Sequence, residues 1–383
     1  MPIQESKVEI RKGLKDVHFD RTKTAFIDGK SGTLLYRGFS IHDLAEKSTF
    51  EETSYLLLYG SLPNRSELDK FDTELKSARE LPDELVSIIH GIKHAHPMDV
   101  LRTTVSAMSS LDPDVLNMSR NAVLKKGIRL IASVPSIVAA HYRIRNGDPP
   151  IASNPTLSHA ANFLSMLFGT DPHAEDSRLI DKDLILHAEH GVNASTFAAR
   201  VAASTSADYY ATITAAISVL KGTKHGGAAE GVITMTQAIG SEENASEYVE
   251  KVIASGGRIM GFGHPVYKAV DPRSLHLKAE AEKLAHRKNE PRWFSILQAV
   301  TETEALKKRA KLGVNPNVDF WAGAIYSLLN IPDDLFVPLF AIGRMPGWTA
   351  HVLEQYSKRD ILRPRLEYTG EHDLLYVPIE ERG

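Results

Sequence analysis

The chain has 383 residues, 43% of them hydrophobic and 24% charged, which is ordinary for a globular protein with a full core. Its net charge of -3 gives no general attraction to nucleic acid or to an anionic membrane, so we expect neither as a partner. The absence of cysteine excludes disulfides, zinc sites built on thiolates and cysteine nucleophiles.

The N-terminal residues 1–7 lack the apolar segment of a signal peptide. No stretch approaches the roughly eighteen uninterrupted apolar residues that a membrane span requires. We therefore expect a cytoplasmic protein.

Residues 9–38 alternate irregularly and carry turn signals around Gly29 and Gly32, which predicts short strands or extended segments. Beyond them the pattern is helical almost everywhere, with Pro97 opening an amphipathic helix and Pro135 expected to kink a long one. The expected helices cover residues 41–47, 50–59, 65–79, 83–92, 97–108, 116–145, 156–168, 178–190, 194–203, 207–220, 227–239, 245–254, 274–287, 292–311, 318–329, 336–342 and 346–357. The tail, residues 360–383, looks extended. With so few β-rich windows, the predicted fold class is all-α.

A glycine-rich loop presents one histidine in an unusual setting. Gly261 and Gly263 remove side chains on either side of Phe262, so a ligand or another backbone can approach closely. Pro265 then holds His264 in an extended conformation. The pattern indicates an imidazole on a stiff, open loop, although a surface loop with a stray histidine has the same pattern.

Two further histidine segments allow a functional and a structural interpretation. His187 and His190 lie three residues apart and would share a helix face, which suits a metal ion or simply two satisfied helix-end side chains. His225 precedes a helix, where the positive end of the dipole disfavours imidazolium. A neutral imidazole there could donate a hydrogen bond to a carbonyl oxygen, or the segment could be only a capping loop.

Asp319 begins an apolar helix, where the commonest role of aspartate is N-capping. Beside Phe320 and Trp321, however, a desolvated carboxylate would become more basic, as a general base requires. Three arginines stand next to glycine or proline in rigid frames that suit carboxylate binding, although each could also form a surface salt bridge. They are Arg273, Arg344 and Arg363.

Taken together and in this order, the segments resemble the citrate synthase family over most of the chain. The most specific motifs are His225-Gly226-Gly227, Gly261-Phe262-Gly263-His264 and Asn317-Val318-Asp319. Further matches are Leu35-Tyr36-Arg37-Gly38, His96-Pro97-Met98-Asp99, Gly347-Trp348-Thr349-Ala350-His351 and Arg363-Pro364. The family includes 2-methylcitrate synthases with the same motifs, and the chain is similar to its compact archaeal and bacterial dimers. The less typical segment 19–30 contains no residue that matches a catalytic position.

The resemblance implies a Claisen-type condensation of acetyl-CoA with oxaloacetate. Asp319 would be the base, His225 the donor to the thioester oxygen and His264 the donor to the keto oxygen. The oxaloacetate and citrate ligands would be His190, Arg273, Arg344 and, from the second subunit of a homodimer, Arg363. CoA would lie along Arg258, Ile259, Met260, Gly261 and Phe262. No metal and no cofactor is implied.

The resemblance also implies two helical domains with the substrates in the cleft between them. The large domain would comprise residues 1–222 and 330–383, and the small one residues 223–329. A 2-methylcitrate synthase that uses propionyl-CoA is the alternative within the family. A helical metal-binding or scaffold protein without catalysis is the alternative from another class.

Overall fold

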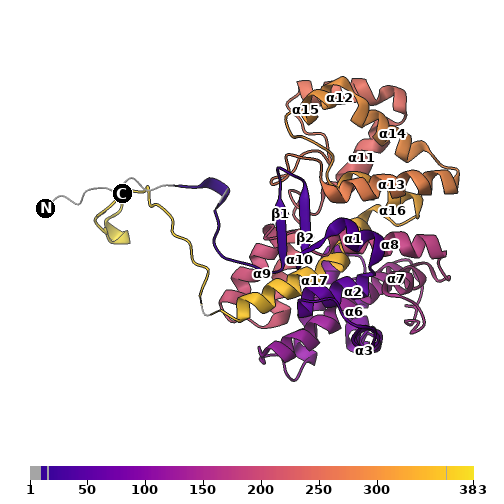
Figure 1. Ribbon diagram of the computed structural model, residues 1–383. Helices are drawn as coiled ribbons and strands as arrows, with labels where there is room; N and C mark the ends of the chain where they lie inside the picture. Colours follow the sequence, from indigo (N-terminus) through magenta and orange to yellow (C-terminus); the bar gives the residue numbers. More distant parts are fainter. Residues whose placement is uncertain (1–9, 15–16, 359) are drawn as a thin grey trace.

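The computed structural model describes residues 10–14, 17–358 and 360–383. Residues 1–7, for which no signal peptide was predicted, lie outside the described residues. The fold is all-α, as predicted (Figure 1). Among the described residues, no helix is both long and apolar enough to cross a membrane. In chain order the helices are α1 (Ile41–Lys47), α2 (Phe50–Tyr59), α3 (Arg65–Ser77), α4 (Asp83–Gly91), α5 (Pro97–Ala107), α6 (Arg120–Arg145), α7 (His159–Phe168), α8 (Ala174–His187), α9 (Ala194–Ser204), α10 (Tyr209–Leu220), α11 (Ala228–Ile239), α12 (Ala245–Ala254), α13 (Pro272–Lys288), α14 (Arg292–Glu302), α15 (Glu304–Ala310), α16 (Val318–Leu328) and α17 (Phe336–Tyr356).

The extended N-terminal segment forms a small antiparallel sheet. Strand β1 (Ala25–Asp28) pairs with β2 (Thr33–Tyr36), which pairs with β3 (Phe39–Ser40). At the hairpin tip, the carbonyl oxygen of Gly29 accepts hydrogen bonds from the backbone N–H groups of Lys268 (2.8 Å) and Ala269 (3.1 Å). A β-carbon at position 29 would lie 2.1 Å from the carbonyl oxygen of Val266, so only glycine fits there. The hairpin is thereby joined to the loop that carries His264.

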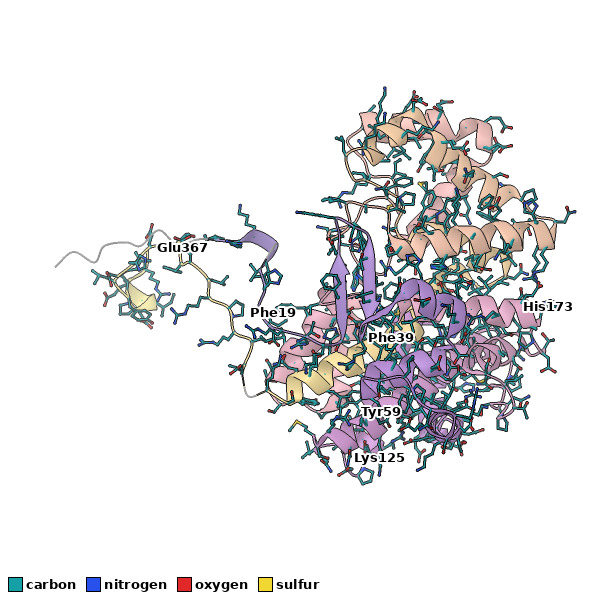
Figure 2. All side chains as sticks on the ribbon, in the orientation of Figure 1. Phe19, Phe39, Tyr59, Lys125, His173 and Glu367 are labelled. Atoms are coloured by element: carbon teal, nitrogen blue, oxygen red, sulfur yellow. The ribbon has the colours of Figure 1, made fainter. Side chains whose placement is uncertain are left out.

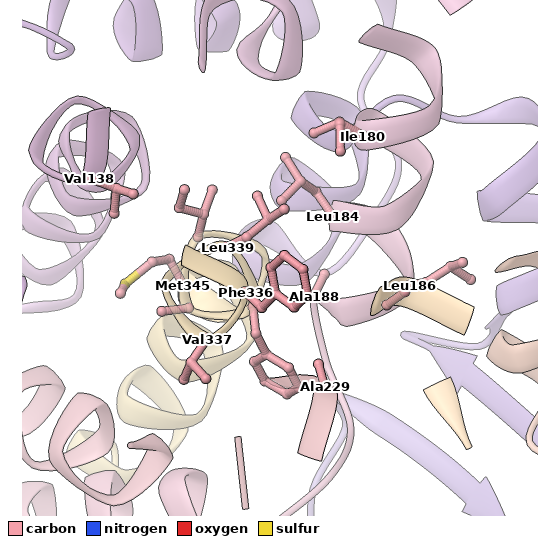
Figure 3. Packing of buried hydrophobic residues seen from close by; sticks show 14 of the residues in the cluster. Val138, Ile180, Leu184, Leu186, Ala188, Ala229, Phe336, Val337, Leu339 and Met345 are labelled. Carbon is pink, nitrogen blue, oxygen red and sulfur yellow. The ribbon is translucent and has the colours of Figure 1, made fainter. Parts of the chain in front are cut away.

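Helix α17 lies in the middle of the larger group of helices and packs against α2, α6, α8 and α9. Nearly all of its side chains are buried, and each fully buried large apolar side chain stabilises the fold by about 1.5–3 kcal/mol. Figure 3 shows part of this core, with Phe336, Leu339 and Met345 of α17 among Ile180 and Leu184 of α8 and Val138 of α6.

The predicted helices are wrong at two places, one where a break was predicted and one where none was. Pro346 was expected to separate two segments, but α17 continues through it, because burial along the whole helix outweighs the one hydrogen bond that proline removes. The segment 292–311 was expected to be a single helix, but it divides at Thr303. The side chain of Thr303 accepts a hydrogen bond from Leu306 N and so caps the second helix, α15.

Helices α11 to α16 pack mainly against one another and form the upper group in Figure 1, coloured coral to orange. Helix α13 also contacts α1 and α8 of the lower group, and α11 contacts α17. The division at residues 222/223 and 329/330 stays a prediction. The C-terminal segment 360–383 leaves the body in an extended form, and Figure 2 places Glu367 well away from the helices.

Candidate active site

A cavity of about 810 Å³ opens between the hairpin, the turn after α8, the loops that precede α11, α13 and α16, and helix α17. Its wall includes almost every residue that the sequence singled out, from segments far apart in the chain. These are His190, His225, Arg258, Ile259, Met260, Gly261, Phe262, His264, Arg273, Asp319 and Arg344. Arg363 is not among them: it is exposed in the C-terminal segment, and its role across a subunit interface stays a prediction.

The loop around His264 is fastened to the start of α16. Gly261 and Gly263 have positive φ angles of 73° and 82°, and a β-carbon at Gly261 would lie 2.8 Å from the ring of Phe320. The Nδ1 atom of His264 accepts hydrogen bonds from Val266 N (3.0 Å) and Tyr267 N (3.2 Å). Since Nδ1 is an acceptor, the ring hydrogen is on Nε2 and available for donation. Burial, followed by the charge of Arg273, lowers the pKa of His264 to about 4, so the ring is neutral at pH 7.

His190 does not lie on a helix face with His187, because α8 ends at His187. Its Nε2 atom is 3.2 Å from the hydroxyl of Tyr267, and its ring centroid is 4.9 Å from that of His264. Burial and the charge of Arg273 lower its pKa well below the ordinary value. His187 instead bonds to the carbonyl oxygen of Asp183, and in the described part of the chain no three metal-ligating side chains gather into a candidate metal site.

His225 lies in the turn before α11, and its Nε2 atom is 2.8 Å from the hydroxyl oxygen of Ser195. The residue does not cap the helix, because α11 begins after Gly227 without a side-chain cap. Since Nε2 faces Ser195, Nδ1 is the ring nitrogen left for the cavity. Burial, with a smaller contribution from Arg344, lowers the pKa of His225 to about 4. This imidazole is therefore also neutral.

Asp319 is the second residue of α16 and is not its N-cap. That role belongs to Asn317, whose side-chain oxygen accepts a hydrogen bond from Asp319 N at 3.0 Å. The carboxyl group of Asp319 is buried, and burial raises its pKa to about 6 in spite of the nearby positive charge of Arg273. A carboxylate with this pKa is ionised at pH 7 and is a stronger base than an exposed aspartate.

Two of the arginines that line the cavity, Arg273 and Arg344, are both buried but differ in their partners. Arg273 binds the carboxylate of Asp271 with Nε (3.0 Å) and Nη2 (2.7 Å), and this carboxylate outweighs burial and raises the pKa of Arg273. Arg344 donates from Nε to the carbonyl oxygen of His187. Its Nη1 and Nη2 atoms are buried without a hydrogen-bond partner in the described residues. Burial lowers the pKa of Arg344 to about 10, so it remains charged and can bind an anion.

Several wall and supporting residues escaped the sequence analysis. Ile27 of the hairpin lines the cavity, although no residue of segment 19–30 matched a catalytic position. Lys224 and Arg309 line it as well. Three supporting residues contact the cavity residues: Asp271 binds Arg273, Tyr267 contacts His190 and Ser195 contacts His225. Only the Asp271-Pro272 pair, which predicts a helix start, offered a local signal.

Comparison with known proteins decides the family. The family model described as citrate synthase, C-terminal domain, matches residues 13–365. The chain belongs to the citrate synthase family. A citrate synthase of Deinococcus radiodurans is 44% identical over 374 residues, which cover 97% of this chain and 99% of that protein. The 2-methylcitrate synthase 1 of Corynebacterium glutamicum is 41% identical over 383 residues, covering 98% and 100%.

A solved member of the citrate synthase family has the same fold. The citrate synthase of Thermoplasma acidophilum, in a ternary complex with carboxymethyl coenzyme A and oxaloacetate, superposes with a TM-score of 0.93. It is 34% identical, and the match covers 98% of this chain and 100% of that one. The resemblance noted from the motifs is thus confirmed over the whole chain.

Proposed function

We propose that this member of the family is a citrate synthase, which condenses acetyl-CoA with oxaloacetate and water to give citrate and CoA. The observation that carries the proposal is the meeting, in one cavity, of a carboxylate with a raised pKa, two neutral imidazoles and an arginine with free N–H groups. Proton abstraction from a thioester methyl group needs such a combination, because so weak a carbon acid requires a base and a donor acting together.

In the first step Asp319 removes a proton from the methyl carbon of acetyl-CoA. The electron pair moves into the thioester, and His225 donates a hydrogen bond from Nδ1 to the developing enolate oxygen. That donation requires Nε2 of His225 to accept from Ser195. In this structure the single Ser195 hydroxyl hydrogen is donated to Oδ1 of Asn193 (2.8 Å), and the oxygen accepts a hydrogen bond from Trp348 Nε1 (3.2 Å). The proposed step therefore requires the hydroxyl to turn this hydrogen from Asn193 to His225 Nε2, which lies at the same distance of 2.8 Å.

In the second step the nucleophilic carbon attacks the keto carbon of oxaloacetate. Nε2–H of His264 polarises the keto oxygen and protonates the alkoxide as the C–C bond forms. His190, Arg273 and Arg344 bind the substrate carboxylates, and water then hydrolyses the citryl thioester to citrate and CoA. Atoms and electrons balance between the two substrates and water, so the proposal needs no resident metal or redox cofactor.

The CoA portion is assigned to the main chain of Arg258, Ile259, Met260, Gly261 and Phe262. Lys224 and Arg309 also line the cavity, and their positive charge suits the CoA phosphates. We further propose a cytoplasmic homodimer in which Arg363 completes the neighbouring oxaloacetate site. The exposed apolar side chains of the C-terminal segment, among them Leu366 (97% exposed) and Leu375 (91%), support burial against a partner.

The test is CoA thiol release from acetyl-CoA in the presence of oxaloacetate, compared with release from propionyl-CoA. A citrate synthase has the higher kcat/KM with acetyl-CoA. The reverse ratio identifies a 2-methylcitrate synthase, the alternative supported by relatives of that name at nearly equal identity. No release with either thioester leaves a non-catalytic helical protein. Omission of oxaloacetate controls for simple thioester hydrolysis.

A further inference from the structure

One face of α17 contacts the turn that carries His190 at three successive points. Arg344, Gly347 and His351 lie on this face because they are three and four residues apart. Arg344 Nε donates to the carbonyl oxygen of His187. A β-carbon at Gly347 would lie 2.2 Å from the carbonyl oxygen of Ala188, so helix and turn are in direct backbone contact. The third contact joins His351 to Glu189, two fully buried side chains that no step of the mechanism uses.

The Glu189 carboxylate ties the turn to itself and to α17. Its Oε1 atom accepts hydrogen bonds from the backbone N–H of Gly191 and from Nε2 of His351, the latter at 3.0 Å. These two hydrogen bonds fix the backbone on both sides of His190, which lies between Glu189 and Gly191. The backbone N–H of Glu189 donates to the hydroxyl of Tyr36 (3.2 Å), which fixes the other side of the turn.

The direction of the bond between His351 and Glu189 follows from a third residue. Nη1 of Arg200 lies 3.1 Å from Nδ1 of His351, and a guanidinium group can only donate. Nδ1 of His351 is therefore an acceptor, and the ring hydrogen is on Nε2, from which it is donated to Glu189. The buried chain Arg200–His351–Glu189–Gly191 thus has a single consistent hydrogen-bond order.

We propose that Glu189 and His351 are positioning residues for the oxaloacetate site, holding the His190 turn in register with Arg344 on α17. The inference rests on the proposed function, because it names the ligand of this site. Two groups that bind the same small dianion must keep a fixed separation, and a displacement of about 1 Å can cost a hundredfold in rate. We call the hydrogen-bonded pair of Glu189 and His351 the tether. Neither residue contacts the segment Arg258–Phe262 proposed to bind CoA, so loss of the tether should weaken oxaloacetate binding and leave acetyl-CoA binding largely unchanged.

The experiment compares Glu189→Ala with Glu189→Gln. Alanine removes the acceptor, whereas glutamine retains an oxygen for both Gly191 N and His351 Nε2. We expect Glu189→Ala to raise the Kd and KM for oxaloacetate at least about tenfold, with the KM for acetyl-CoA changed less than about twofold. Glu189→Gln keeps the oxaloacetate Kd within about threefold of wild type. Calorimetric titration with oxaloacetate alone supplies the Kd without turnover.

The matched control is Glu51→Ala. Glu51 is also buried and accepts a backbone hydrogen bond, from His159 N at 2.7 Å, but it does not line the cavity. Its removal lowers Tm as the removal of Glu189 does, yet leaves the oxaloacetate Kd unchanged. His351→Phe has the selective effect of Glu189→Ala, and the two changes together cost little more than either alone, since both break one tether.

The proposed role of the tether is contradicted if Glu189→Ala leaves the Kd for oxaloacetate within twofold of wild type, or if it weakens the binding of both substrates equally. It is also contradicted if Glu189→Gln raises the Kd for oxaloacetate as much as Glu189→Ala does. Failure of the proposed function looks different. In that case the wild-type protein itself neither binds oxaloacetate nor releases CoA.

Discussion

Asn317 caps helix α16, so the carboxylate of Asp319, two residues later, is not needed to cap the helix. The Asn317 side chain accepts from Asp319 N at 3.0 Å, so the helix end is satisfied whatever the state of the Asp319 side chain. Asp319→Asn should therefore fold normally. We expect it to lower kcat by about 10²–10⁴-fold, the usual worth of a general base, while the Kd for oxaloacetate stays close to wild type. Steady-state kinetics and a binding titration measure both, and a variant that keeps more than about a tenth of kcat would show that Asp319 is not the base.

Acid should inactivate the enzyme through a single group. Burial raises the pKa of Asp319 to about 6, whereas His225 and His264 have pKa values lowered to about 4. The base must be ionised and the histidines neutral. As pH falls through about 6, kcat/KM for acetyl-CoA should drop about tenfold per pH unit, with the second and third protonations reached only near pH 4. A profile of kcat/KM from pH 4.5 to 8 measures this. A limb that falls a hundredfold per unit near pH 6 would instead implicate a histidine together with Asp319.

Arg363 is expected to act in the neighbouring subunit. Inactive Arg363→Ala and Asp319→Asn chains, mixed so that subunits exchange, should regenerate activity, since one of the two sites in a mixed dimer retains both residues. At equal concentrations about half of the dimers are mixed, so recovery should approach about a quarter of wild-type activity. Mass spectrometry confirms that mixed dimers form. Mixed dimers without recovered activity would refute the assignment of Arg363 across the interface.

Oxaloacetate should bind first and strengthen binding of the thioester. His190 and Arg344 belong to the proposed large domain, and His264 and Arg273 to the small one, so a dianion held by all four draws the domains together. Acyl-CoA makes no such bridge. We expect saturating oxaloacetate to make the binding free energy of a non-reactive acyl-CoA analogue more favourable by about 1–3 kcal/mol, a typical coupling between two sites. Calorimetry with and without oxaloacetate compares the affinities, and equal values would contradict closure driven by oxaloacetate.

Sequence reasoning located helices best where the end signals are local. The range predicted for α2 matches the structure because Thr49 caps its start and Gly60, with a φ of 94°, ends it. The prediction failed at Pro346, since burial of α17 depends on helices that are distant in the chain. A local breaker signal carries no information about that burial.

The same distinction holds for the site. His264 was identifiable because its glycines and Pro265 are adjacent in sequence. Ser195, which faces His225, and Glu189, which faces His351, were not, since each pair meets only after helices from different parts of the chain have packed. The residues proposed to bind substrate lie in sequence motifs, whereas the residues that orient them are recognisable only in the three-dimensional structure.

The contact between Gly29 and the His264 loop bears on how the chain is made. The two segments are more than half the chain apart, and the wall that they share is finished by α17, close to the C-terminal end. During synthesis the hairpin emerges early, and its partner loop is absent until most of the polypeptide has left the ribosome. No nascent chain that ends before α17 contains the complete proposed oxaloacetate site. The ligand can therefore stabilise only polypeptides that already include α17, and it cannot guide earlier stages of folding.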